Sequence, residues 1–101
     1  MKKMRALIDW IPKEDGGRTK PPSGVGPHPY STVVRIGEEE WPSAESWSLV
    51  VRKQEAESSE YRWIADVHFL FEEAPQDSLR LGQTFELYEG AKCVARGRIT
   101  E

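Results

Sequence analysis

The chain is organised by an alternation of apolar and polar positions. In MRALIDWI (residues 4–11) every second residue from Met4 to Trp10 is apolar, whereas Arg5 and Asp9 fall between them. Successive side chains of a β-strand point to opposite faces, so this spacing predicts a strand with one buried face. No window of twelve residues shows the three-and-four spacing of an amphipathic helix. The chain is therefore expected to be built from strands.

Five further segments are expected to be strands. They are YSTVVRI (30–36), WSLVVRK (47–53), YRWIADVHFLF (61–71), TFELYE (84–89) and AKCVARGRIT (91–100). In the longest of them, the pattern places the alternate residues from Tyr61 to Phe71 on the buried face. The last two segments are joined by EGAK, in which Gly90 can take a positive φ, and this predicts a tight hairpin.

The expected strands must bury their apolar faces against one another. Six such strands in about 100 residues favour a closed barrel or a sandwich. A closed barrel also removes the exposed strand edges. No internal repeat or low-complexity segment divides the chain, so residues 1–101 are expected to form one domain.

A long connection rich in glycine and proline follows the first strand. Residues 12–30, PKEDGGRTKPPSGVGPHPY, contain five of the seven prolines of the chain. Gly16 and Gly17 can adopt backbone angles that other residues avoid, and the prolines hold the chain extended at low entropic cost. We expect this loop to have a defined structure.

Charge is distributed unevenly along the chain. The net charge is −3, but residues 1–36 carry seven basic and three acidic side chains, so this part is +4 and the remainder is −7. Such asymmetry is typical of a surface that faces a polyanion or a partner protein. A solvated surface with unequal charges is the alternative.

The chain offers few residues for catalysis. His28 and His68 are its two histidines, and Cys93 is its one cysteine. The motifs GxSxG, HExxH, CxxC and GxGxxG do not occur, and GGRTKPPSG lacks the spacing of a phosphate-binding loop. Cys93 and His68 form a pair only if their strands meet; otherwise Cys93 is a small packing residue. We expect a protein that is not an enzyme, with no catalytic residue, cofactor, metal or nucleotide.

The compartment is expected to be the cytoplasm. A single cysteine excludes an internal disulfide and fits a reducing environment. Asp9 and Lys13 interrupt the first apolar run too early for an export signal. The chain has no run of about 18 apolar residues, so we expect no membrane partner.

Trp41 stands outside the alternating pattern. It follows Glu38, Glu39 and Glu40 in GEEEWPSAE and precedes a proline. An indole is suited both to an exposed contact with a partner and to packing over the end of a barrel. These four residues are candidate contacts for a protein partner.

Two separated pieces of the sequence resemble the C-terminal β-barrel domain of elongation factor Tu. The first is the opening strand followed by KEDGGRTKPPSGVGPHPY, and the second is VHFLFEEAP with LRLGQTFELYEGAKCVARGRITE. Their order and separation agree with that domain, and the resemblance covers nearly the whole chain. It implies an all-β fold, a six-stranded antiparallel closed β-barrel, in which the long loop connects the first two strands.

The resemblance also implies candidate RNA contacts. The elongation factor uses this barrel to contact the T-stem of aminoacyl-tRNA, its exchange factor and its own GTPase domain, which this chain lacks. The contacts map onto the GGRTK loop and the EGAK hairpin, that is Gly16, Gly17, Arg18, Thr19, Lys20, Gly90 and Lys92. This sequence has Ala91, Lys92 and Ala95 where glycine, arginine and glycine are usual, and the loss of a guanidinium fork weakens contact with phosphate.

The sequence is compatible with three functions. The first is a stand-alone, non-catalytic binding module that docks another protein through barrel loops. The second is a tRNA- or RNA-binding accessory of translation that uses the basic GGRTK loop, and whose binding falls steeply with salt. The third is an enzyme of unrecognised type.

Overall fold

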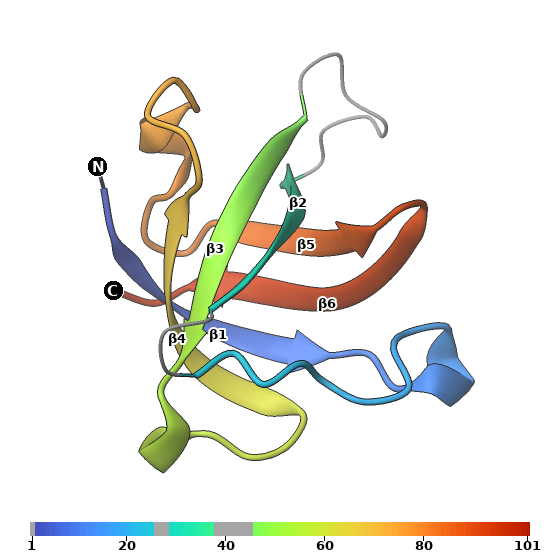
Figure 1. Ribbon diagram of the computed structural model, residues 1–101. Helices are drawn as coiled ribbons and strands as arrows, with labels where there is room; N and C mark the ends of the chain where they lie inside the picture. Colours follow the sequence, from blue (N-terminus) through green and yellow to red (C-terminus); the bar gives the residue numbers. More distant parts are fainter. Residues whose placement is uncertain (1, 26–28, 38–45) are drawn as a thin grey trace.

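The computed structural model describes residues 2–25, 29–37 and 46–101, and these form an all-β protein (Figure 1). Its six strands are β1 (Met4–Trp10), β2 (Tyr30–Ile36), β3 (Trp47–Lys53), β4 (Arg62–Phe69), β5 (Thr84–Glu89) and β6 (Lys92–Ile99). The six strands expected from the alternation are therefore confirmed. The largest difference is in β4. It begins at Arg62, one residue later than expected, and ends at Phe69, two residues earlier than expected.

The strands close into a barrel in which every neighbouring pair is antiparallel. The order around the ring is β1-β4-β3-β2-β5-β6, and β6 pairs again with β1. Ala6 of β1 lies opposite Ala65 of β4 on one side and opposite Ile99 of β6 on the other. The closed barrel, rather than the sandwich, is thus the architecture, and the expected six-stranded antiparallel barrel is confirmed.

Alternate residues of the strands fill the interior. Fully buried side chains include Ile8 of β1, Leu49 and Val51 of β3, and Trp63 of β4. The expected inward position of Phe71 is wrong, because this side chain is 55% exposed. The strand ends at Phe69, and from Leu70 onward the chain leaves the barrel wall, so the alternation no longer decides which side a residue faces.

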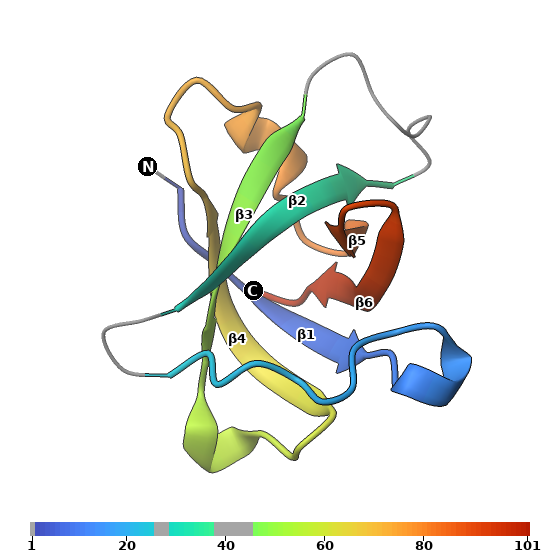
Figure 2. The same ribbon diagram turned by 45° about the vertical axis from the view of Figure 1, so that its right-hand side comes forward.

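The long connection after β1 has a topological cause. In the ring, β1 and β2 are three places apart in either direction, so residues 11–29 must cross the end of the barrel. Figures 1 and 2 show the described part of this segment, up to residue 25, running past the start of β4. The carbonyl of Gly24 accepts a hydrogen bond of 2.7 Å from Lys53 N, and a Cβ at Gly24 would lie 2.6 Å from the Trp63 ring. The loop is therefore packed onto the core.

A second connection crosses the opposite end. Strands β4 and β5 are also three places apart in the ring, and residues 70–83 join them. Within this segment Ala74 and Leu79 are buried and belong to the core cluster. One crossing segment therefore closes each end of the barrel.

Three short 3-10 turns lie in the connections, and the sequence pattern did not predict them. They are η1 (Lys13–Asp15), η2 (Glu55–Glu57) and η3 (Gln76–Ser78). Each has three residues, which is too short to produce an apolar periodicity. No helix in the described ranges is long and apolar enough to span a bilayer.

Candidate functional site

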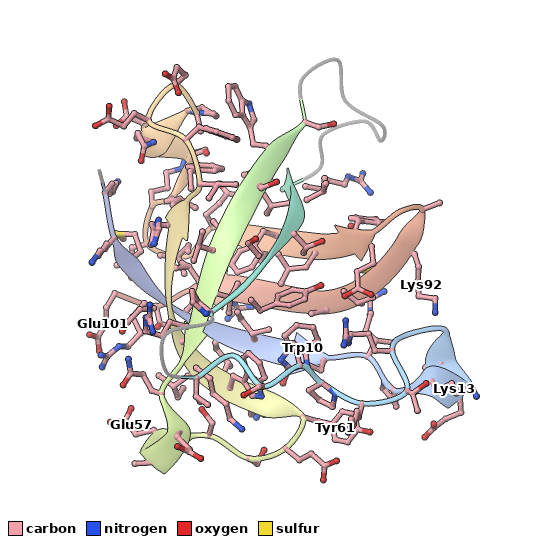
Figure 3. All side chains as sticks on the ribbon, viewed as in Figure 1. Trp10, Lys13, Glu57, Tyr61, Lys92 and Glu101 are labelled. Atoms are coloured by element: carbon pink, nitrogen blue, oxygen red, sulfur yellow. The ribbon has the colours of Figure 1, made fainter. Side chains whose placement is uncertain are left out.

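The GGRTK loop and the EGAK hairpin lie next to each other at one end of the barrel. Turn η1 ends at Asp15 and is followed by Gly16, whose φ of 94° is left-handed; Gly17 N then donates to Pro12 O at 2.9 Å. Gly90, with φ of 62°, forms the turn between β5 and β6. Figure 3 shows Lys13 and Lys92 on the same side of the molecule.

Arg18 is held in this loop by partners from two other elements. Its guanidinium donates to the carboxylate of Glu89 at the end of β5, and the hydroxyl of Tyr30 donates to the same carboxylate oxygen. The guanidinium carbon also lies 5.7 Å from the centre of the Tyr30 ring, within cation–π range. We call Arg18, Tyr30 and Glu89 the Arg18 cluster. It fastens the loop to β2 and β5.

The contacts within the Arg18 cluster shift two pKa values. Desolvation, which acts to raise the pKa of Glu89, is outweighed by the hydrogen bonds from Tyr30 and Arg18, so that pKa is lowered. Burial, reinforced by the hydrogen bond to Glu89, raises the pKa of Tyr30 well above its ordinary value. Glu89 is therefore ionised and Tyr30 neutral at physiological pH, which is the combination that the contacts require.

A shallow depression lies between the loop and the hairpin. Lys92 Nζ donates to Gly17 O at 3.3 Å and so bridges the two segments. The lining residues are Arg18, Thr19, Lys20, Glu89 and Lys92. The structure thus brings together the side chains that the resemblance implied as RNA contacts. The two turn glycines, Gly16 and Gly90, have open space around them and act only through the backbone.

Gly17 has a packing role. A Cβ at this position would lie 1.7 Å from Ile11 O, so no side chain fits without moving the strand end. The charge of the depression is modest, since three cations and Glu89 give a net +2. Because Arg18 is already paired with Glu89, Lys20 and Lys92 are the cations left to face a ligand.

The opposite end of the barrel exposes apolar side chains. Leu70 is 44% exposed, Phe71 is 55% exposed and Leu81 is 73% exposed, and all three lie on the connection between β4 and β5. We call residues 70–81 the β4–β5 segment. Its acidic residues are Glu72, Glu73 and Asp77, which are also exposed.

Glu38, Glu39, Glu40 and Trp41 lie outside the described residues. The chain on either side of them is held at the end of the barrel where the β4–β5 segment lies. Gly37 N donates to the carbonyl of Thr84, the first residue of β5, at 2.9 Å, and Leu70 N donates to Ser48 O at 2.9 Å. The connection that contains the four residues therefore starts and ends at the same end of the barrel as the exposed apolar residues.

His68 and Cys93 are far apart. His68 pairs with Val50 near the start of β1, and its Nδ1 lies 2.9 Å from Phe69 O. Cys93 pairs with Tyr88 at the other end of the barrel wall, and the intervening length of β1 alone is about 20 Å. Burial, followed by the charge of Glu86, raises the pKa of the Cys93 thiol. No group of three His, Cys, Asp or Glu side chains suited to a metal occurs in the part of the chain that the structure describes.

Several of these residues were missed by the sequence reasoning. Tyr30 was assigned only to a strand face, and Glu89 only to a strand end, because a contact 59 or 71 residues away leaves no local signal. Phe71 was assigned to the interior. The acidic pair after it and Pro75 were the available signs that the strand had ended.

Comparisons with known proteins leave the family open. No protein-family model matches this chain, and no curated protein matches it.

Proposed function

We propose that this protein is a non-catalytic binding module that docks another protein through the end of the barrel at which the β4–β5 segment lies. The observation that carries the proposal is the exposure of Leu70, Phe71 and Leu81 on one connection. Exposed apolar anchors within a polar rim are the usual composition of a protein-binding surface.

The chemistry of the rim indicates the chemistry of the partner. Glu72, Glu73 and Asp77 carry three negative charges on the β4–β5 segment, and Arg80 carries one positive charge. Three further glutamates, Glu38 to Glu40, precede Trp41 in the neighbouring connection. The partner therefore presents an apolar pocket that is bordered by lysine or arginine, because opposite charges at the rim raise the association rate and exclude wrong partners.

The fold supports a relation to the C-terminal β-barrel domain of elongation factor Tu, which is part of this proposal. The closed six-stranded antiparallel barrel and the long loop between β1 and β2 are the two features that the resemblance implied. A shared fold does not carry the activity with it, so the docking surface is argued from its own residues.

Site-specific photo-crosslinking tests this function. A photoreactive phenylalanine analogue at position 71 should capture one discrete protein in the source cells, whereas the same analogue at position 20 should not. The variant F71A/L81A should lose the capture when the analogue is placed at position 70, with an unchanged unfolding midpoint because these side chains are exposed. Replacement of Trp41 by alanine should also weaken the capture of the partner protein.

The matched control is K20A/K92A, which changes the opposite end of the barrel. This variant should retain the captured protein. Equal capture from positions 71 and 20, or unchanged capture by F71A/L81A, would show that the β4–β5 segment is not the docking surface.

The depression between the loop and the hairpin favours RNA as a second candidate ligand. Arg18, Thr19, Lys20 and Lys92 all border it. Binding of a tRNA should then fall steeply with salt, because phosphate contacts release counterions. Each lysine replaced in K20A and K92A should reduce the slope of log K against log salt by about 0.7–0.9. Absence of tRNA binding at low salt would exclude this candidate.

A further inference from the structure

The outer face of the barrel carries a row of alternating charges. The strand register places Arg62 of β4 opposite Asp9 of β1, Asp9 opposite Arg96 of β6, Arg96 opposite Glu86 of β5, and Glu86 opposite Arg35 of β2. We call these five residues the charged row. It crosses five of the six strands, and three of its members are arginines.

Ion pairs orient the arginines of the charged row. Arg62 Nε donates to Asp9 Oδ1 at 2.7 Å. Glu86 is shared, with Arg35 Nη1 at 3.3 Å from one oxygen and Arg96 Nε at 3.4 Å from the other. A guanidinium has five N–H donors, so one shared carboxylate leaves donors on Arg96 unused. The side chain of Arg96 is 67% exposed.

Arg98 lies in the next row and faces no carboxylate. Its neighbours across the strands are Leu7 of β1 and Thr84 of β5. No ion pair to Arg98 occurs among the residues that the structure describes. Four arginines and two carboxylates together give this face a net charge of +2.

The two rows border a single open pocket of about 550 Å³. Its lining includes Arg35, Arg62, Arg96 and Arg98, the carboxylates Asp9 and Glu86, and the side chains of Leu7 and Thr84. Gly97, which lies between Arg96 and Arg98 in β6, also lines the pocket. A volume of this size suits a small metabolite.

We propose that this pocket binds a small molecule that carries a phosphate dianion, with Arg98 and Arg96 as the residues that contact the phosphate. The planar guanidinium matches phosphate oxygens with two parallel hydrogen bonds, which an ammonium group does not reproduce. The net charge of the face, +2, is equal in size and opposite in sign to that of the phosphate dianion. Asp9 and Glu86 hold Arg62 and Arg35 in place and offer acceptors to hydroxyl groups of the ligand.

This site is separate from both surfaces discussed above. Its charged residues lie on the outer faces of the strands, whereas the β4–β5 segment and the loop–hairpin depression lie at opposite ends of the barrel. Gly37, which precedes the connection between β2 and β3, also lines the pocket. Failure of the protein-docking function would therefore leave this inference unaffected.

Titration followed by amide NMR tests the site. The probes are inorganic phosphate and glycerol 3-phosphate, with glycerol and matched chloride as blanks. Saturable one-to-one binding is expected, with the largest amide shifts at Gly97 and Arg98. The variant R98Q should weaken binding at least about tenfold, since it removes a charge-assisted pair of hydrogen bonds. The variant R98K, which keeps the charge but loses the fork, should be intermediate.

The matched control is R80Q, which removes one exposed arginine from the β4–β5 segment and leaves the net charge of the protein equal to that of R98Q. It should bind both probes as the unchanged protein does. An equal loss of probe affinity in R80Q and R98Q would mean that only the overall charge of the protein matters, and would overturn the proposal. Shifts that stay linear to about 20 mM probe, or that centre on Lys20 and Lys92, would also overturn it.

A short single-stranded oligonucleotide separates a small ligand from a polymer. It should compete weakly with glycerol 3-phosphate at the pocket. Tighter binding of the oligonucleotide than of glycerol 3-phosphate, abolished by R98Q, would assign the pocket to nucleic acid and reject the small-molecule ligand.

Discussion

At the scale of single residues, Glu89 and Gly97 each have a contact that constrains the side chain at that position. Glu89 accepts hydrogen bonds from Arg18 and Tyr30 and so joins three elements. Gly97 lies opposite Phe85, and a Cβ there would be 2.3 Å from Phe85 Cζ. One of these positions requires a charge, and the other requires the absence of a side chain.

The lowered pKa of Glu89 makes part of the stability depend on pH. Because its folded pKa lies below the ordinary value of 4.5, the stabilisation is present above that value and is lost as the pH falls through the folded pKa. Replacement of Glu89 by glutamine should cost about 1–2 kcal/mol at neutral pH, because charge-assisted hydrogen bonds at a partly exposed site are lost. Urea unfolding at about pH 7 and about pH 3.5 measures the change in stability on acidification.

The other carboxylates titrate in both the unchanged protein and E89Q. The difference between the unfolding free energies of these two proteins therefore isolates the effect of Glu89. The unchanged protein should lose more stability than E89Q on acidification, so the difference between them should be smaller at the lower pH. A constant difference at both pH values would contradict the role given to the Arg18 cluster.

Gly97→Ala should destabilise the barrel by about 1–3 kcal/mol, the usual cost of overpacking. Phe85 is 2% exposed, so its ring has no room to retreat from the new methyl group. The free energy of unfolding measures the effect, and the double variant G97A/F85L is the control. If F85L does not relieve the cost of G97A, the clash with the ring is not its cause.

At the scale of elements, the strands were predictable and the contacts between connections were not. Alternation identified all six strands because each one has a face against a single core, and Trp10 and Trp63 are buried as that pattern requires. It failed at Phe71, beyond the strand end, where no sheet face exists to impose a period of two.

The candidate sites were likewise predictable in part. The loop and the hairpin were expected as binding elements, and their residues do come together at one depression. The pairing of Arg18 with Glu89 was not foreseen, since strand register across the barrel cannot be read from one sequence. Arg96 and Arg98 had a readable sign, a two-residue spacing that places both on the outer face of β6.

The loop between β1 and β2 can be tested through two glycines with similar backbone angles. Gly24 has φ of 67° and Gly90 has φ of 62°, but a Cβ would meet the Trp63 ring only at Gly24. Alanine at Gly90 should cost about 1–2 kcal/mol from the left-handed conformation alone. Alanine at Gly24 should cost about 1–3 kcal/mol more, because it also forces the loop away from the core.

The excess of G24A over G90A in the free energy of unfolding is the quantity to measure. Equal costs would mean that the loop is not anchored on Trp63, and that its passage across the barrel end contributes little to stability.

At the scale of the whole molecule, the barrel is closed by strands from the two ends of the sequence. Ala6 of β1 pairs with Ile99 of β6, and the next-longest pairings join β1 to β4. The two connections that cross the barrel ends also separate strands in sequence, so the pairs β1/β4, β2/β5 and β1/β6 are neighbours in the ring but not in the chain. Local contacts are correspondingly few.

This topology should make folding slow. Strand pairings distant in sequence require long loops to close before any contact forms, and such all-β domains fold in milliseconds to seconds. Stopped-flow refolding from urea, followed by tryptophan fluorescence, measures the rate. Refolding in tens of microseconds would contradict the dominance of distant pairings.

The pairing of β1 with β6 also has a consequence during synthesis. Residues 92–99 leave the ribosome after every other strand, and until they arrive β1 and β5 each lack one neighbour. A nascent chain therefore carries two open strand edges, which are templates for pairing with other chains. These edges remain open until β6 has been made, so the barrel gains the protection of a closed sheet only when its last strand pairs with both neighbours.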